Sequence, residues 1–263
     1  MASKGPKTNI NNILINWTAP NMMKAGVVFD AIYLSDLEKV DLSKYKVVIF
    51  NNTFILNQHQ RQFISDKVMK DKRDVIWFYA PGYSDGMKLD VNLMSDLTGI
   101  SLIQTDSITL PIIKTTGLPG SSFTFDIRRG SERSESTFQI KENNSSYSPL
   151  FAVNDDKVET LGIYISDKKP AIARKKLHDC TSYYIGLPAY EPELIKGILQ
   201  LSNAHKFTDE DDIVYSGNGL LSFHSKNGGL KKVALKGGKI VELNLEKNST
   251  VIIDNQTGEI LLK

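Results

Sequence analysis

The pattern of apolar residues in the first half of the chain predicts alternating strands and helices. Val75–Ala80 is an unbroken run of β-branched and aromatic residues, and Pro81-Gly82 ends it. A run that is apolar on both faces is typical of a central strand in a parallel sheet, which helices cover on both sides. A second apolar run at Lys46–Phe50 predicts a neighbouring strand, and residues 57–71 carry apolar side chains at helical spacing.

The same alternation extends to both sides of these elements. Residues 27–34 read as a further strand. Asp90 is placed to cap a helix that ends at Leu97, and Gly99 lies just beyond its end. The resulting strand–helix–strand–helix order predicts an α/β fold with a mostly parallel sheet, helices on both faces and right-handed crossovers.

Residues 105–148 interrupt this order. They are rich in Ser, Thr, Gly and Asn, and predict an irregular β excursion of short strands. Further on, residues 160–176 predict a β-hairpin, and residues 181–186 predict another short strand. Residues 193–204, with Pro192 at the first turn, predict a helix with a broad apolar face.

The composition of the chain changes after His205. Six short apolar segments follow, separated by turn sequences rich in Gly and Asn. Turns at this spacing predict a small antiparallel sandwich or barrel. We therefore expect a polar leader with an irregular or helical lead-in at residues 1–26, an α/β domain at 27–206 and an antiparallel β domain at 207–263.

Composition and charge exclude several classes of protein. The 32 basic and 30 acidic residues give a net charge of +2, which provides no electrostatic footprint for nucleic acid or for an anionic membrane. Cys180 is the only cysteine and the four histidines are scattered, so the sequence predicts no internal disulfide, no metal site and no cofactor. It contains no signal peptide or membrane-spanning run, which predicts a cytoplasmic location for the chain as it stands.

Several segments in a fixed order carry a resemblance to a known family. They are YLSDLE, KYKVVIFNNTF, VIWFYAPGYSDG and LMSDLTGI in the first half, then TSYYIGLPAYEPELIKGIL and DDIVYSGNGLLSFHS. Over residues 27–263 the chain resembles the C-terminal region of β-galactosidase-like glycoside hydrolases of family 42. The resemblance implies a flavodoxin-like domain of the class I glutamine-amidotransferase type, followed by a small C-terminal β domain.

The resemblance also implies a role for the chain. In that family the acid and the nucleophile that cleave the sugar lie on a (β/α)₈ barrel that precedes this region, and this sequence contains no such barrel. The amidotransferase-like domain is non-catalytic there, supports oligomers and borders the active site. The expected function is therefore an accessory or oligomerisation module, whose partner is a second copy of the chain or a glycoside hydrolase catalytic domain.

A hydrolase or amidotransferase-like enzyme is the alternative. Sheets of this type place a Ser or Cys nucleophile in the turn after a central strand, where this chain has Ala80-Pro81-Gly82. Cys180 lies far from this turn in the sequence and two positions from His178, and on a strand these two side chains share a face. An atypical site near Cys180 and His178 is therefore the enzyme hypothesis, whereas the accessory module is assigned no catalytic residue.

A third hypothesis is carbohydrate binding without catalysis. Aromatic side chains at or just after strand ends offer faces on which a sugar can stack, although packing in the core is the more common role of such residues. The candidate ligand-binding residues are Asn51, Asn52, Tyr79, Tyr83, Asp85, Tyr183, Tyr184 and Tyr190.

Overall fold

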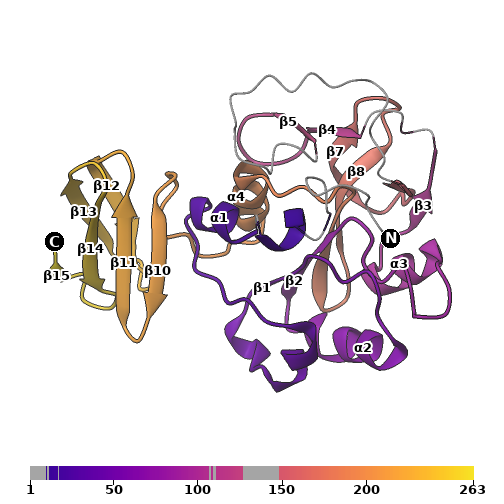
Figure 1. The fold of residues 1–263 in the computed structure, drawn as a ribbon, viewed down its shortest axis with the longest axis horizontal. Helices are drawn as coiled ribbons and strands as arrows, with labels where there is room; N and C mark the ends of the chain where they lie inside the picture. Colours follow the sequence, from indigo (N-terminus) through magenta and orange to yellow (C-terminus); the bar gives the residue numbers. More distant parts are fainter. Residues whose placement is uncertain (1–9, 11, 17, 107, 109–110, 127–147) are drawn as a thin grey trace. The chain divides into compact units, whose positions relative to one another are not determined.

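The computed structural model describes residues 10, 12–16, 18–106, 108, 111–126 and 148–263. The chain forms two compact units (Figure 1). The first unit contains Met1–Trp17 and Ile32–Glu191, and the second contains Thr18–Ala31 and Pro192–Lys263. The helix expected at residues 193–204 thus falls in the second unit, while the natural domain boundaries, placed after residues 26 and 206, stay a prediction.

A seven-stranded sheet forms the centre of the first unit, in the order β1-β2-β9-β8-β7-β4-β5. Its strands are β1 (Val47–Phe50), β2 (Arg73–Phe78), β4 (Ile112–Thr115), β5 (Thr124–Asp126), β7 (Glu159–Tyr164), β8 (Pro170–Lys176) and β9 (Cys180–Ile185). β1 and β9 flank β2 and run parallel to it, with Val48 opposite Val75 and Tyr183 opposite Ile76. Every residue of β2 is buried, which confirms its predicted place as a central strand.

The sheet is mixed, so the prediction of a mostly parallel sheet is wrong. Among the described strands of this sheet, β1, β2 and β9 are parallel, and β8, β7, β4 and β5 continue it in antiparallel pairs. The cause is the hairpin predicted at residues 160–176, which the structure confirms as β7 and β8 and which pairs along β9. Because a tight hairpin turn reverses the chain direction, these two strands are antiparallel.

The helices of the first unit begin and end at the expected signals. α2 (Gln58–Phe63) continues as a π-helical turn, η4 (Ile64–Val68), and α3 spans Val91–Thr98. Asn57 and Gln60 form a capping box at the start of α2, in which each side chain accepts the other residue's backbone N–H, at 2.9 and 3.0 Å. Asp90 caps α3, and Gly99 ends it with a left-handed φ of 70°. Both predicted helices are confirmed.

The predicted strand at residues 27–34 is wrong. The stretch forms no strand, and the 3₁₀ helices η2 (Leu34–Lys39) and η3 (Leu42–Lys44) follow it. Its apolar side chains include Ile32 and Tyr33, which are exposed, whereas a strand of this composition is stabilised by burial against neighbouring strands. The chain's described N-terminal part also contains a short π-helix, η1 (Asn12–Asn16).

The predicted excursion at residues 105–148 contributes β4 and β5 to the large sheet. Residues 127–147 lie outside the described residues. On either side of the excursion, β3 (Leu102–Gln104) and β6 (Phe151–Val153) pair as a separate antiparallel two-stranded sheet. The excursion therefore begins and ends close together, because its two flanking strands are hydrogen-bonded to each other.

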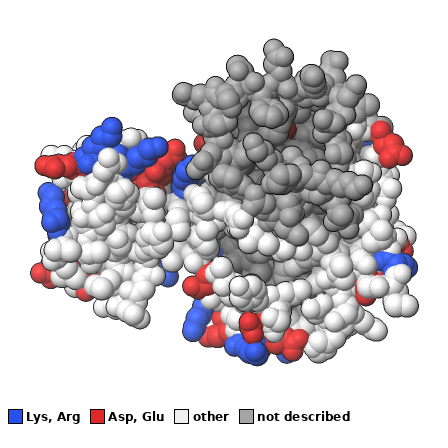
Figure 2. All heavy atoms as spheres, viewed as in Figure 1, with Lys and Arg blue, Asp and Glu red and all other residues white. Residues whose placement is uncertain are grey.

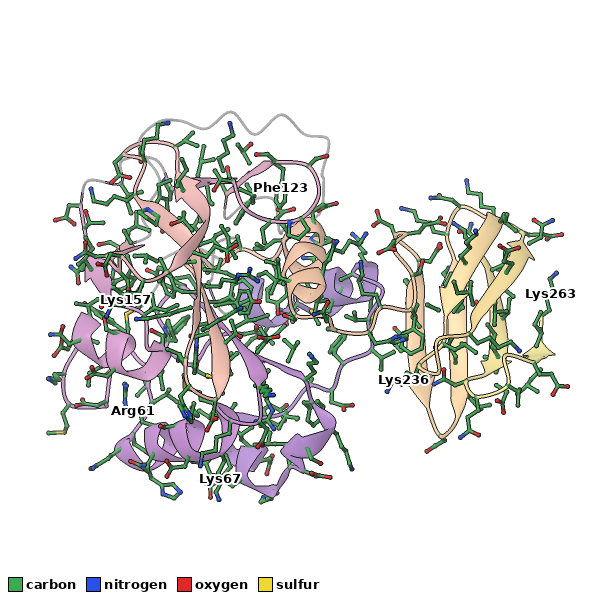
Figure 3. The ribbon with its side chains drawn as sticks, turned by 180° about the vertical axis from the view of Figure 1, so that it is seen from behind. Arg61, Lys67, Phe123, Lys157, Lys236 and Lys263 are labelled. Atoms are coloured by element: carbon green, nitrogen blue, oxygen red, sulfur yellow. The ribbon has the colours of Figure 1, made fainter. Side chains whose placement is uncertain are left out.

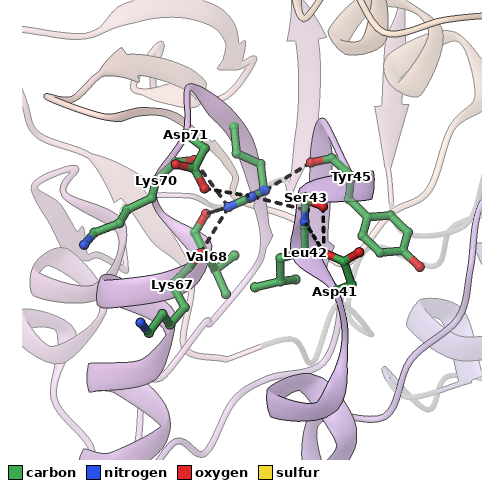
Figure 4. Close-up of polar contacts among 9 residues, drawn as sticks. Asp41, Leu42, Ser43, Tyr45, Lys67, Val68, Lys70 and Asp71 are labelled. Atoms are coloured by element: carbon green, nitrogen blue, oxygen red, sulfur yellow. Dashed lines mark hydrogen bonds and ion pairs between the residues drawn. The ribbon is translucent and has the colours of Figure 1, made fainter.

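A buried arginine ties several segments of the first unit together (Figure 4). The side chain of Arg73, at the start of β2, is 3% exposed and donates hydrogen bonds to five backbone carbonyls. The acceptors, at 2.7–3.3 Å, belong to Leu42, Tyr45, Lys67, Val68 and Lys70. Three of them lie at the end of η4, where a helix leaves its last carbonyls without intrahelical partners. One guanidinium therefore joins η3 and its cap to the end of η4.

The second unit combines two helices with two antiparallel sheets. α1 (Thr18–Lys24) packs against α4 (Pro192–Leu201). The larger sheet has the order β10-β11-β14-β15, and β12 pairs with β13 in the smaller one. The strands are β10 (Ile213–Gly217), β11 (Leu220–Ser225), β12 (Gly229–Ala234), β13 (Ile240–Leu245), β14 (Ser249–Asp254) and β15 (Ile260–Leu262). They correspond to the six apolar segments, so the antiparallel character predicted for this region is confirmed.

The buried core of the second unit is apolar, with a buried pair of charged side chains beside it. Phe207, Leu221 and Phe223 are among its buried members. Lys231 on β12 has a side chain that is 4% exposed, and its Nζ lies 3.1 Å from the carboxylate of Asp212, which is 2% exposed. Burial alone would lower the pKa of Lys231, but its hydrogen bonds to Glu210 and Asp212 outweigh burial and raise the pKa.

The surface agrees with the small net charge. On the face drawn in Figure 2, the described basic and acidic side chains are interspersed. No helix in the described part of the chain is both long and apolar enough to cross a membrane.

Candidate functional site

The three parallel strands end at one edge of the large sheet, which is where open α/β sheets carry ligands. Most of the predicted ligand residues follow these strands in the sequence, and Tyr183 and Tyr184 lie in the second half of β9. The residues at this edge are Asn51, Asn52, Tyr79, Tyr83, Asp85, Tyr183, Tyr184 and Tyr190. The structure therefore brings together segments that are far apart in the sequence.

The turn after β2 is strained at Tyr79, one position before the Ala80-Pro81-Gly82 stretch that the sequence singled out. Tyr79 has a φ of 63°, a left-handed conformation that is costly for a bulky side chain. Its backbone N–H donates to the carbonyl of Ile185 at 2.7 Å, and its hydroxyl donates to the carbonyl of Pro149 at 2.7 Å. A buried phenol thus occupies the strained position that follows this central strand.

Two further tyrosine hydroxyls near the turn after β2 form hydrogen bonds with backbone carbonyls. The hydroxyl of Tyr184 donates to the carbonyl of Tyr79 at 2.7 Å, and that of Tyr164 lies 2.9 Å from the carbonyl oxygen of Phe151. Burial raises the pKa of both hydroxyls, which therefore remain protonated donors at neutral pH. A Cβ at Gly186 would clash with the Tyr164 hydroxyl, so this close approach requires glycine.

The rings of the candidate tyrosines pack against other aromatic side chains. Tyr83 is 8% exposed and contacts Phe151 edge-on, with ring centroids 5.0 Å apart, and its hydroxyl donates to Gln104 Oε1 at 2.8 Å. The buried Tyr190 stacks on Phe78 with centroids 4.6 Å apart. These rings contribute apolar area to the core. Their role in stacking on a sugar stays a prediction.

Arg61 on α2 holds the turn after β2, and the sequence did not single it out. Its guanidinium donates to the carbonyls of Gly82 and Ser84 in that turn, and to that of Leu93 in α3 at 2.8 Å. Its Nε donates to the carbonyl of Leu56 at 3.0 Å (Figure 3 labels Arg61). Burial lowers the pKa of this guanidinium, and the nearby Asp85 and Asp96 carboxylates oppose the shift. The feature of the sequence that could have indicated this role is a single arginine in a helix that also carries apolar residues.

Among the polar candidates at this edge, Asp85 makes local hydrogen bonds, and the two asparagines differ in solvent exposure. The carboxylate of Asp85 accepts the backbone N–H groups of Lys88 and Met87 at 2.9 and 2.8 Å, and these hydrogen bonds lower its pKa. This is the usual behaviour of Asp in a turn. Asn51 is half-buried and Asn52 is exposed. Their role as ligand residues stays a prediction.

Cys180, the nucleophile of the enzyme hypothesis, lies at the opposite end of the sheet. It is the first residue of β9 and pairs with Arg73, the first residue of β2. At ~3.3 Å per residue, it lies about 10 Å from Tyr183 along β9 and about 17 Å from the end of the strand. The side chain of His178 is 96% exposed, and its Nδ1 lies 3.1 Å from the carboxylate of Asp179.

The surroundings of Cys180 disfavour its thiolate form, whereas an activated thiol needs surroundings that favour it. Burial, together with the Asp74 and Asp179 carboxylates, raises the pKa of the Cys180 thiol to about 11. A nucleophilic cysteine needs a lowered pKa, because the thiolate is the reactive species. The described residues also contain no group of three or more His, Cys, Asp and Glu side chains placed to hold a metal ion.

Comparison with known proteins gives a likeness in structure but not in sequence. No family model matches the chain, and no curated protein sequence matches it significantly. The β-galactosidase from Bacillus circulans sp. alkalophilus matches with a TM-score of 0.65 and 15% identity, over 96% of this chain and 38% of that one. The enzyme from the haloarchaeon Halorubrum lacusprofundi matches with a TM-score of 0.64 and 15% identity, over 95% of this chain and 36% of that one.

A third β-galactosidase, from Rahnella sp. R3, matches with a TM-score of 0.57 and 14% identity, over 91% of this chain and 36% of that one. The chain therefore spans little more than a third of the length of these enzymes. At such low identity the likeness concerns the fold. The chain has the fold of one part of a β-galactosidase.

Proposed function

We propose that the chain is a non-catalytic accessory module of a β-galactosidase-like glycoside hydrolase. The observation that carries the proposal is the asymmetric coverage: 96% of this chain corresponds to a portion that makes up 38% of a β-galactosidase. A chain that matches one part of a larger enzyme over almost its whole length is consistent with a module of such an enzyme. The finer assignment, a domain of the amidotransferase type from a family 42 relative, belongs to the same proposal.

Two features of the site support the accessory role over the enzyme alternative. The strained turn after β2 carries the buried phenol of Tyr79, whose hydroxyl already donates to a backbone carbonyl. Cys180 lies at the other end of the sheet, with a raised thiol pKa and an exposed neighbour in His178. Nucleophilic catalysis needs a nucleophile and a base within hydrogen-bonding distance, with the nucleophile activated.

The partner of such a module is a second copy of the chain or a glycoside hydrolase catalytic domain, and carbohydrate is its candidate ligand. The fold likeness to β-galactosidases supports the catalytic domain as partner, because the matched enzymes are much longer than this chain. The interspersed charges in Figure 2 favour neither nucleic acid nor an anionic membrane surface.

The reactivity of Cys180 separates the accessory proposal from the enzyme alternative. A thiol pKa of about 11 leaves roughly one thiolate in ten thousand at pH 7, against a few per cent for a free cysteine of pKa ~8.5. We expect iodoacetamide to alkylate Cys180 at pH 7 at least about a hundred times more slowly than a cysteine-containing peptide. The rate should rise about tenfold per pH unit up to pH ~10.

Mass spectrometry of the alkylated chain gives these rates, and the same measurement in denaturant provides the control for an accessible Cys180. Slow alkylation in the folded chain that becomes peptide-like in denaturant supports the accessory role. Alkylation of the folded chain at pH 7 that equals or exceeds the peptide rate would mean an activated thiol, and would favour the enzyme.

A further inference from the structure

A surface groove lies in the first unit, and none of the predicted ligand residues lines it. Its volume is about 560 Å³, which falls within the range of pockets for small ligands. One wall is the α2–η4 segment, a second is the end of α3, and a third is the turn between β8 and β9. Because these segments are far apart in the sequence, the pattern of residues along the chain did not reveal the groove.

The α2–η4 wall presents polar side chains from one helical face, and the Gln62 amide donates one hydrogen bond to the Asp66 carboxylate at 2.9 Å. Gln58, Gln62, Ser65 and Asp66 line the groove, and their spacing of four, seven and eight residues places them on the same side of a helix. The wall includes the π-helical turn Ile64–Val68. Single π-helical turns within helices occur frequently at functional sites.

Apolar side chains line another part of the groove, which we call its floor. Leu97, which is 6% exposed, comes from α3, and Leu177 comes from the turn before β9. Gly99, at the end of α3, packs directly against Leu177. It has a left-handed φ of 70°, and a Cβ there would lie 2.8 Å from the Leu177 side chain. The absence of a side chain at this position therefore lets Leu177 close over the end of α3.

The charges of the groove disfavour an anionic ligand. Asp66, Asp96 and Asp179 line it. Lys70 adds one cationic side chain, while the N–H groups of Arg61 are already donated to backbone carbonyls. A phosphate or carboxylate would therefore meet carboxylates without a free bidentate guanidinium to offset them.

The same groups suit a ligand that carries several hydroxyls. Each hydroxyl donates one hydrogen bond and accepts others, which matches carboxylate and amide oxygens that accept and amide N–H groups that donate. The apolar floor matches the C–H face of a sugar ring, which buries apolar area on contact. We infer that this groove binds one neutral saccharide ring between the polar side of α2–η4 and the floor formed by Leu97 and Leu177.

The inferred sugar site goes beyond the accessory role, because it is argued from the groove residues alone and does not depend on that role. A chain that binds sugar but has no turnover satisfies both proposals. Absence of binding would refute the groove site and leave the accessory role standing, whereas galactoside turnover would refute the accessory role without bearing on the groove.

The test is a titration of the whole ¹⁵N-labelled chain with galactose and lactose. We expect saturable chemical-shift changes in residues 58–70, 96–99 and 177–180, with a dissociation constant of about 1–10 mM for a ligand of this size. Saturating sugar should also slow the alkylation of Cys180 at pH ~9, because Cys180 lines the groove. Spermidine and phosphate are the cationic and anionic comparison ligands.

Ser65→Trp fills the groove from an exposed helical position, and Lys67→Trp on the same segment is the matched control outside it. We expect Ser65→Trp to weaken sugar binding at least tenfold and Lys67→Trp to change it less than twofold, with both variants melting near the wild type. No saturable sugar binding, binding that Ser65→Trp leaves unchanged, or tighter binding of spermidine or phosphate would each overturn the inference.

Discussion

Replacing Arg73 with methionine is expected to lower the free energy of unfolding of the first unit by about 3–5 kcal/mol. Methionine is of similar length and lacks N–H groups, so five backbone carbonyls each lose a hydrogen bond. Those of Leu42 and Lys70 keep a backbone N–H donor, whereas the other three lose the guanidinium as their donor. Leaving buried acceptors unpaired costs ~1–3 kcal/mol each, and part of this is recovered where water reaches them. Arg73→Lys should restore only part of the loss, since an ammonium cannot reach acceptors in several directions as the planar guanidinium does.

Urea unfolding followed by the fluorescence of Trp77 measures this effect, because Trp77 is fully buried in the same strand. Arg174→Met is the matched control: Arg174 makes one ion pair with Glu159, which is half exposed, and its loss should cost about 1 kcal/mol or less. Equal losses for the Arg73 and Arg174 variants would contradict the structural role given to Arg73.

Replacing Lys231 with methionine is expected to destabilise the second unit by about 3–5 kcal/mol. The ammonium group of Lys231 lies 3.1 Å from the carboxylate of Asp212, and both side chains are almost fully buried. Without Lys231 the buried carboxylate of Asp212 loses its counter-charge, and it must either stay charged in a poorly solvated position or take up a proton. Adding Asp212→Asn to the variant should recover part of the loss, because the amide is neutral.

Hydrogen exchange of peptides from β11 and β12 in the whole chain measures the opening of this unit. Lys232→Met provides the control from the next position: Lys232 pairs with Glu242 at 3.4 Å, and both side chains are more than half exposed. Its replacement should change the opening free energy by about 1 kcal/mol or less. Similar protection in the Lys231 and Lys232 variants would contradict the role of the buried pair.

Local signals in the sequence predicted individual elements well and their assembly less well. The run at Val75–Ala80 gave a central strand, and Asp90 and Gly99 marked both ends of a helix, because these signals act within one element. The strand prediction for residues 27–34 was wrong because an apolar run forms a strand only when it pairs with a neighbouring strand. The local sequence does not indicate whether such a neighbour is present. The sheet is mixed for the same reason: the hairpin was visible, but its pairing along β9 was not.

The candidate site shows the same division. Sequence reasoning found the residues that follow the parallel strands, and the structure gathers them at one edge. It did not predict that Tyr79 and Tyr184 would be fully buried, because aromatic residues at strand ends pack inward or outward according to what covers them. The groove between α2–η4 and α3 was missed, since its walls come from three separate segments.

The absence of catalysis by the whole chain is the central claim, and a turnover assay tests it most directly. Chromogenic galactosides and glutamine are offered to the purified wild type and to Cys180→Ala. The account predicts no turnover above the buffer rate with either protein. Glutamine or galactoside turnover in the wild type that disappears in Cys180→Ala would contradict it in favour of an enzyme that uses this thiol. Galactoside turnover that survives the substitution would contradict it too, and would require a pair of carboxylates about 5–10 Å apart in this chain.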